Sequence, residues 1–149
     1  PLVRREPELI HGIRNIVHNA LKFSKSYVDI NLIVNSRKIN LEIIDDGLGF
    51  PHDVKNMIGE PFLKRSELNF EGVKTKTPEE GMGLGLFIAN ILLERTKGKL
   101  KFSNVKQIEN NGKKQVKGAK VEVSWDRSSI EVLNREKKDK VKENPRNVS

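Results

Sequence analysis

Cysteine is absent from this 149-residue sequence, which excludes a disulfide framework and a cysteine-based zinc site. The three histidines, His11, His18 and His52, lack the spacing of metal ligands. No apolar run approaches the roughly 18 residues of a membrane span, and the N-terminus has no signal-peptide pattern. The first residue is Pro1 and not Met, which suggests a piece cut from a longer chain. We therefore expect one folded domain from a reducing compartment, large enough to bury a core without metal or disulfides.

Aromatic residues are scarce at 5%, although the net charge of +8 is typical of nucleic-acid binding. Eight lysines lie between Lys97 and Lys120 against the single acid Glu109, and Phe102 is the one aromatic residue among them. A base-stacking platform is therefore disfavoured. We interpret this region as a solvated hairpin whose lysines protect an exposed strand edge, and nucleic acid as the less favoured partner.

Hydrophobic periodicity predicts two helices and two hairpins. Apolar residues from Pro7 to Phe23 follow helical spacing, with Pro7 suited to the first turn, and Leu84 to Thr96 is again helical, with Gly98 as a stop signal. The β-branched runs "YVDINLIV" and "KINLEII" flank the turn "NSRK" and end at Asp45. "KLKFSN" and "GAKVEVSW" flank "ENNGKK" as a second hairpin.

The remaining segments show neither period. Residues 50–81 form a long polar segment with a possible short helix at 53–58, and a loop of this length in a compact domain is usually functional or disordered. Residues 131–149 are charged and predict a disordered tail. The order helix, hairpin, long loop, helix, hairpin predicts an α+β, two-layer sandwich with a mostly antiparallel sheet covered by helices on one face.

The stretch "GMGLGL" places Gly81, Gly83 and Gly85 before the second helix. It fits neither the dinucleotide-binding G-x-G-x-x-G pattern, because Leu86 occupies the last glycine position, nor the P-loop. Glycines ahead of a helix nevertheless let backbone N–H groups approach a phosphate, and the helix N-terminus favours an anion. A simple hinge is the alternative for this stretch taken alone.

Three further segments precede these glycines in order. "RNIVHNALKFS" spaces Asn15 and Asn19 one helical turn apart, "DDGLGF" supplies a D-x-G-x-G pattern, and "GEPF" opens the long loop. The series resembles the N, G1, F and G2 boxes of the catalytic ATP-binding domain of sensor histidine kinases, over roughly residues 8–127. The stretches "GMGLGLFIANILLERTKGKLKFSN" and "GAKVEVSWDR" look most like the redox-responding RegB/PrrB type. The resemblance implies the Bergerat-type ATP-binding fold of the superfamily that includes gyrase and heat-shock ATPases.

The resemblance assigns the first helix to magnesium and phosphate. Asn19 would be the Mg²⁺ ligand, since a neutral amide oxygen suits a hard cation. Asn15 and Lys22, one turn to either side, would support the metal and the phosphates, and together with Asn19 they are the catalytic residues that the resemblance implies. Phe23 would pack beside the nucleotide or in the core.

Asp45 matches the family residue that accepts a hydrogen bond from the adenine amino group. Guanine presents an acceptor at that place, so ATP should be preferred to GTP by about 10⁴-fold or more. Gly47 and Gly49 would let the backbone pass close to the base, and Asp46 stands at a variable position of the motif with no assigned role. A strand-end turn is the alternative for Asp45.

The resemblance also makes residues 50–81 an ATP lid, in which Lys64 or Arg65 would reach the terminal phosphate. The remaining residues that would contact ATP lie in or just after this segment: Phe62, Gly81, Met82, Gly83, Leu84 and Gly85. The glycines would make room for the phosphates, with Leu84 beginning the helix that faces them.

Phosphoryl transfer needs a nucleophile in line with the γ-phosphate, and none of the three histidines stands in the family's phosphoacceptor motif. The resemblance therefore implies a catalytic fragment: residues 1–7 would be a linker remnant, 8–130 the ATP-binding domain and 131–149 the tail. The phosphoacceptor histidine would lie on a separate dimerisation domain of the same parent. That parent would be a homodimer anchored in the bacterial inner membrane, with this domain in the cytoplasm and a response regulator as indirect partner.

Three alternatives stay open from the sequence. A stand-alone serine kinase of the anti-sigma-factor type shares the fold and size. A non-catalytic module would use ATP to open and close a partner surface. A nucleic-acid binder would show steeply salt-dependent binding through Lys97 to Lys120.

Overall fold

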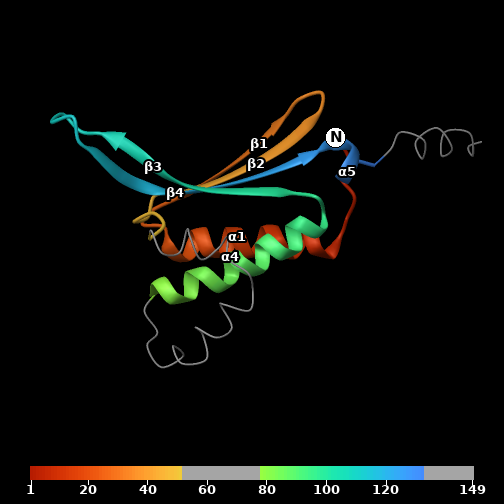
Figure 1. The fold of residues 1–149 in the computed structure, drawn as a ribbon, viewed down its shortest axis with the longest axis horizontal. Coiled ribbons are helices and arrows are strands. Elements are labelled where there is room, and N and C mark those ends of the chain that lie inside the picture. The colour runs from red at the N-terminus through yellow and green to blue at the C-terminus, as the bar shows by residue number, and fades with distance from the viewer. Residues whose placement is uncertain (52–77, 133–149) are drawn as a thin grey trace, which may run out of the picture.

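The computed structural model describes residues 1–51 and 78–132, with the side chains of 78–83 excepted. Two long helices and four strands make up most of this part of the chain (Figure 1). The elements are, in order, α1 (Pro7–Phe23), β1 (Val28–Val34), β2 (Lys38–Asp45), α4 (Pro78–Arg95), β3 (Lys99–Ile108), β4 (Lys114–Asp126) and α5 (Arg127–Ile130).

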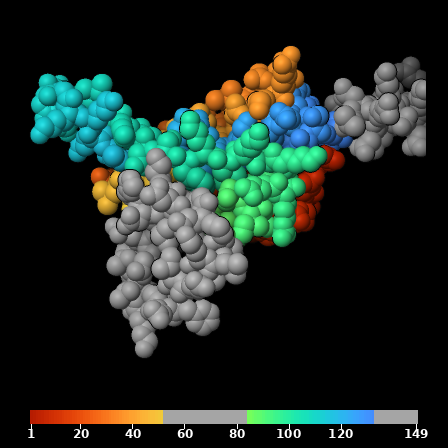
Figure 2. Space-filling view, viewed as in Figure 1, coloured from red at the N-terminus to blue at the C-terminus, as the bar shows by residue number. Residues whose placement is uncertain are grey.

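The four strands form one sheet in the order β1-β2-β4-β3, and each neighbouring pair is antiparallel. Helices α1 and α4 run antiparallel to each other and cover one face of the sheet (Figure 1). The α+β sandwich with helices on one face is therefore confirmed. The predicted bounds of α1 and of the first hairpin agree with the structure, whereas the second hairpin extends several residues further, past the helix layer (Figure 2).

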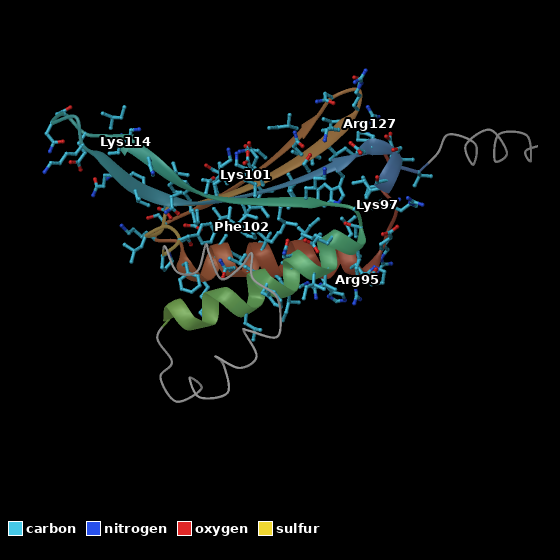
Figure 3. All side chains as sticks on the ribbon, in the orientation of Figure 1. Arg95, Lys97, Lys101, Phe102, Lys114 and Arg127 are labelled. Atoms are coloured by element: carbon cyan, nitrogen blue, oxygen red, sulfur yellow. The ribbon has the colours of Figure 1, made fainter. Side chains whose placement is uncertain are left out.

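Alternation along the strands directs apolar side chains into the core between sheet and helices. Figure 3 shows this on β3, where Phe102 points toward the helices and Lys101 lies on the opposite face. The core joins residues from both layers: Ile16 of α1, Ile39, Leu41 and Ile43 of β2, Leu86, Ala89 and Leu93 of α4, and Val121, Val123 and Trp125 of β4. Gly12 allows α1 to pack closely on α4, since a Cβ there would lie 2.5 Å from Leu93 Cγ.

Helix α4 begins earlier than the sequence pattern predicted. It starts at Pro78, so the expectation that Leu84 opens the helix is wrong, and the backbone of Gly81, Gly83 and Gly85 is helical. Glycine accepts helical dihedral angles at about 1 kcal/mol less stability than alanine, and the apolar run that follows supports helix propagation. A start signal was present in "TPEE", where Thr77 precedes Pro78 and Glu80 stands at the capping-box position.

The sequence predicted Gly98 as the stop signal of α4, but the residue in the left-handed conformation at the end of this helix is Lys97. Lys97 adopts the left-handed conformation with φ 65°, its N–H donates to the carbonyl of Glu94, and the N–H of Gly98 donates to the carbonyl of Leu93. These are the paired bonds of a Schellman motif with lysine at the position that usually holds glycine. Gly98 has its own constraint, because a Cβ there would lie 2.6 Å from Trp125 Nε1.

Replacing Lys97 with glycine should raise the free energy of unfolding by about 1 kcal/mol, because a side chain in the left-handed region is strained. Thermal or urea unfolding measures the gain. The matched control is Lys99→Gly, which removes an exposed lysine from a strand and should lower stability slightly. A Lys97 variant no more stable than wild type would show that Lys97 is not strained.

The two ends of the described chain lie together. Val3 and Glu131 form an antiparallel bridge, the N–H of Arg4 donates to Ile130, and the N–H of Val132 donates to Leu2. Residues assigned from the sequence to a linker and a tail thus pair beside the short helix α5, which the sequence pattern did not predict. The expected helix at 53–58, most of the lid and the tail beyond residue 132 lie outside the described residues.

Candidate functional site

Three segments of the predicted site meet at one end of the sandwich. The C-terminal half of α1, the "DDGLGF" loop after β2 and the N-terminal half of α4 lie at the same end of the helix layer (Figure 1). The loop and α1 are in direct proximity, because a Cβ on Gly47 would collide with the carbonyl oxygen of Phe23. The fold therefore brings together residues that are far apart in the sequence.

Asp45 is the most buried charged residue of this region, with 5% of its surface exposed. Its Oδ1 accepts hydrogen bonds from the N–H of Gly47 at 2.8 Å and of Ala119 at 3.4 Å. From the described residues, Oδ2 accepts no hydrogen bond. Burial raises the pKa of Asp45 above its ordinary value, against the opposing effect of the two N–H donors. The result is a fixed carboxyl group with one oxygen left for a donor from outside.

Asp46 has a structural role that the sequence did not reveal. Its carboxylate accepts hydrogen bonds from the backbone N–H groups of Lys25, Ser26 and Tyr27 at 2.9 to 3.2 Å. These bonds hold the pKa of Asp46 below its ordinary value, and the bond from Ser26 has the largest effect. Asp46 thereby ties the segment after α1 to the end of β2.

An Asp46→Asn variant should be less stable than wild type at neutral pH. The lowered pKa means that the stability contributed by Asp46 is complete above the ordinary value of 3.8 and is lost as the pH falls through the folded-state pKa. The difference in melting temperature should therefore be constant near neutrality and shrink in acid. Melts across this range measure it, with Glu109→Gln, in the exposed turn of the second hairpin, as control. A difference that persisted in strong acid would contradict the carboxylate's role.

The two glycines of the loop pack against the protein itself. Gly47 lies against the end of α1, as above, and Gly49 has φ 83° with a Cβ position 2.5 Å from Val116 Cγ1 and 3.0 Å from Asn104 Oδ1. A side chain at either position would displace the loop. The prediction that these glycines let the backbone approach a base stays a prediction.

Strands β3 and β4 hold the loop from its other side. The side-chain amide of Asn104 makes two hydrogen bonds to the backbone of Phe50. Its Oδ1 accepts from the N–H at 2.7 Å, and its Nδ2 donates to the carbonyl oxygen at 3.2 Å. The Phe50 ring meets Phe102 edge to face with centroids 5.9 Å apart. A Cβ on Gly118 would collide with the carbonyl oxygen of Asp45. A lone glycine inside a strand pattern can mark such a close approach, but Asn104 carries no comparable signal.

Helix α1 presents the predicted metal-side residues on one flank. Asn15 and Asn19 are partly buried, and Lys22 is exposed with its Nζ 5.4 Å from the centroid of the Phe23 ring. Phe23 packs against the hydrophobic core, which agrees with the second of its two expected roles. Around the axis of α1, Gly12 points in a direction between that of the two asparagines and that of the core. Because Gly12 faces Leu93 of α4, Asn15 and Asn19 lie on the flank of α1 that is next to α4.

The structure describes the α4 residues of the predicted site only in part. Gly81, Met82 and Gly83 have a helical backbone, Leu84 is exposed, and a Cβ on Gly85 would meet no described atom within 4 Å. Phe62, Lys64 and Arg65 lie outside the described residues. In the described part of the chain, no group of three or more histidine, aspartate or glutamate residues could hold a metal ion.

Comparison with known proteins gives the class of the chain. Residues 4–129 match the family described as histidine kinase-, DNA gyrase B- and HSP90-like ATPase, and the chain belongs to that family. It is 39% identical over 127 residues to the sensor histidine kinase RegB of Cereibacter sphaeroides, covering 84% of this chain and 27% of that protein. It is 28% identical over 101 residues to the sensor histidine kinase CpxA of Escherichia coli K12, covering 68% and 21%. The chain thus spans about a quarter of these relatives.

Solved structures show the same fold. The mycobacterial sensor histidine kinase MprB matches with a TM-score of 0.58 at 19% identity, covering 84% of this chain and 76% of that one. Full-length ShkA in complex with AMPPNP matches with a TM-score of 0.53 at 20% identity, covering 78% and 21%. The resemblance to sensor histidine kinases, read from four short motifs, is confirmed.

Proposed function

We propose that this chain binds Mg-ATP and donates its γ-phosphate to a histidine on a separate dimerisation domain of the same parent kinase. The observation that carries the proposal is Asp45. A buried carboxyl whose Oδ1 is fixed by two backbone N–H groups, and whose Oδ2 accepts no hydrogen bond from the described residues, is an acceptor prepared for a ligand donor.

The adenine amino group supplies such a donor, whereas guanine would oppose its carbonyl oxygen to the carboxylate. The fixed position of Oδ1 matters here, because the carboxyl group cannot rotate away without breaking its bonds to Gly47 and Ala119. The Asp45 loop is itself held by Asp46, Asn104 and Gly118, as described above. Adenine recognition would therefore fall on a part of the fold that these contacts hold in place.

The opposite side of the site would hold the metal and the phosphates. Asn19 offers an amide oxygen of the kind that Mg²⁺ accepts in mixed shells with phosphate oxygens and water, and Asn15 lies one turn away. Lys22 is exposed, and its Nζ, which lies 5.4 Å from the centroid of the Phe23 ring, would reach a phosphate. Magnesium, when bound, would neutralise the charge that develops on the phosphates during transfer. Gly81, Met82, Gly83, Leu84 and Gly85 would border the phosphates, and Phe62 would close the lid.

The phosphoacceptor would come from outside this chain. His11 and His18 are exposed on α1, and His52 lies outside the described residues. The sequence around each of the three histidines does not match the phosphoacceptor motif of the family. We propose a homodimeric parent in the bacterial inner membrane, with this domain on the cytoplasmic side and a response regulator receiving the phosphoryl group. Among the helices of the described residues, none has the length and apolarity of a membrane span.

A transfer assay tests the proposal. The chain is incubated with labelled ATP and the histidine-bearing dimerisation domain of its parent, and the expected product is an acid-labile phosphohistidine on that domain. An acid-stable phosphoserine on a partner would favour the anti-sigma type of kinase instead. ATP binding without transfer would favour the non-catalytic module, and the Asp45→Asn chain is the control for label transfer by contaminants.

A further inference from the structure

The two edges of the sheet differ in how they are protected from pairing. The β3 edge carries lysines at Lys99, Lys101 and Lys106, and Figure 3 shows further lysine at Lys114 in the same hairpin. The β1 edge, "VDINLIV", has Asp29 as its single charged residue. Lysine on an edge strand discourages pairing with another chain, whereas a regular apolar edge favours it. No lysine stands within Val28–Val34 to protect the β1 edge in this way.

Within residues 1–51 and 78–132, the helices leave the face of β1 that points toward the helix layer largely exposed. Ile30, Leu32 and Val34 pair with Ile43, Leu41 and Ile39 of β2, which are buried under the helices. Opposite residues of an antiparallel pair lie on the same face, so the three β1 side chains point to the helix side as well. Yet Ile30 is 54% exposed and Leu32 is 63% exposed. The helices shield β2 and leave β1 open.

Helix α1 extends this apolar face. Ile10, Val17 and Leu21 share one side of the helix, and Ile10 and Leu21 are exposed. That side is opposite to the flank on which Gly12 meets α4, so it points toward the β1 side of the sandwich. We call the combined set the β1 surface; it consists of Ile10, Val17, Leu21, Ile30, Leu32 and Val34.

The backbone of β1 also has unpaired groups at this edge. The N–H of Asn35 donates to the carbonyl of Lys38 at the hairpin turn, which makes this a hydrogen-bonded pair. Hydrogen-bonded and non-hydrogen-bonded pairs alternate along an antiparallel ladder, so Val28, Ile30, Leu32 and Val34 direct their N–H and C=O groups away from β2. Across residues 1–51 and 78–132, no strand pairs with this side of β1.

We propose that β1 is a self-association edge, on which two copies of this chain pair antiparallel and join their sheets into one. Full overlap of Val28–Val34 with its copy places Asn31 opposite Asn31 and Ile30 opposite Leu32. Even-numbered residues then face even-numbered residues, so both helix layers lie on the same side and the two β1 surfaces become continuous. This inference is independent of ATP binding and of the proposed kinase function.

The charge distribution favours a second copy as the occupant. In the fully overlapping register Asp29 faces Ile33, so the residues of Val28–Val34 bring no like charges together, although each copy carries a net charge of +8. The lysines of the β3 edge lie on the far side of the sheet, whereas Lys25 and Arg37 flank the two ends of the paired segment. Residues 133–149 of the same chain are a poorer match, because Leu133, Val141 and Val148 are their only large apolar residues.

Sedimentation velocity across a concentration series tests the pairing. We expect reversible dimers at micromolar concentration, and at least tenfold weaker association for Leu32→Lys, which places a charge at the centre of the edge. The matched control is Ile108→Lys, since Ile108 is 69% exposed on β3 and lies outside the β1 surface. Circular dichroism establishes that both variants fold. A chain that stays monomeric, or two variants that dimerise equally well, would overturn the proposal.

The absence of cysteine allows a second, register-specific test. Asn31 lies in a non-hydrogen-bonded pair with its copy, where Cα atoms are about 4.5 Å apart and within the range of a disulfide. An Asn31→Cys chain should therefore form disulfide-linked dimers under mild oxidation, and Ile108→Cys should not. Equal cross-linking of the two variants would indicate random collision. Dimers in sedimentation without Asn31→Cys cross-linking would place the interface elsewhere, and either result contradicts the proposed edge.

Discussion

Replacing Asp45 with asparagine should weaken ATP binding strongly and, at the same time, make the folded domain more stable at neutral pH. Binding should weaken by about 100-fold or more, because the variant presents an amide N–H₂ group where the adenine amino group needs an acceptor. Asparagine has nearly the shape of aspartate and keeps an oxygen for the N–H groups of Gly47 and Ala119. The loss would thus arise without a change of the loop.

The expected gain in stability follows from the pKa of Asp45, which burial raises. The folded chain binds this proton more tightly than the unfolded chain, so the ionised carboxyl destabilises the fold at pH values above its folded-state pKa. That destabilisation declines as the pH falls through the raised pKa and is absent well below the ordinary value of 3.8. The difference in melting temperature between variant and wild type should shrink in the same way.

Calorimetric titration with a non-hydrolysable ATP analogue, with and without magnesium and beside GTP, measures the first effect, and thermal melts measure the second. Asn15→Ala is a useful comparison, because it should weaken magnesium-dependent binding and leave the acid-side melting behaviour unchanged. ATP binding that survives Asp45→Asn would show that Asp45 is not the adenine acceptor. A variant that melts below wild type at neutral pH would show that the buried carboxylate stabilises the fold.

Replacing Gly118 with alanine should destabilise the domain by about 2 to 4 kcal/mol, although alanine is the smallest possible side chain. The Cβ would meet the carbonyl oxygen of Asp45, which belongs to the backbone of β2 and has no rotamer in which to avoid it. Strands β2 and β4 would have to separate where the Asp45 loop begins. We therefore expect weaker ATP binding along with the lower stability.

Urea unfolding and ATP titration of the Gly118 variant test both parts. Lys117→Ala is the matched control, since it changes the neighbouring exposed residue of β4 and should leave stability within about 0.5 kcal/mol of wild type. A Gly118→Ala chain as stable as wild type would mean that the two strands are further apart at this point than the structure has them.

Local sequence patterns were enough to predict the helices and hairpins whose secondary structure depends mainly on their own residues. The 3.6-residue period and Pro7 defined α1, and β-branched runs around "NSRK" defined the first hairpin. Four ordered motifs were enough to identify the family. The start of α4 was missed because the three glycines were placed ahead of the helix, as phosphate-binding or hinge residues, while the "TPEE" signal and the apolar run on their C-terminal side favour helix. Local reasoning gave too much weight to a modest propensity.

The residues that hold the site could not be found in this way. Asp46 acts on residues 25–27, Asn104 on Phe50, and Gly118 on Asp45, so each acts on a segment that is remote in sequence. Nothing in the immediate neighbours of Asn104 indicates that its amide will bind the backbone of residue 50. Such roles follow from the sheet order, which places β4 beside β2, and only the assembled fold contains that information.

The two halves of helix α4 differ in how strongly they are stabilised. Leu86, Ala89 and Leu93 fix the C-terminal half in the core, whereas three of the residues from Gly81 to Gly85 are glycines that make the first turns weaker by about 1 kcal/mol each than an alanine helix. The first turns of α4 are therefore intrinsically weaker than the half of the helix that packs in the core. The packed half of α4 therefore anchors the helix, while its N-terminal turns lie at the end of the sandwich where the Asp45 loop also lies (Figure 1).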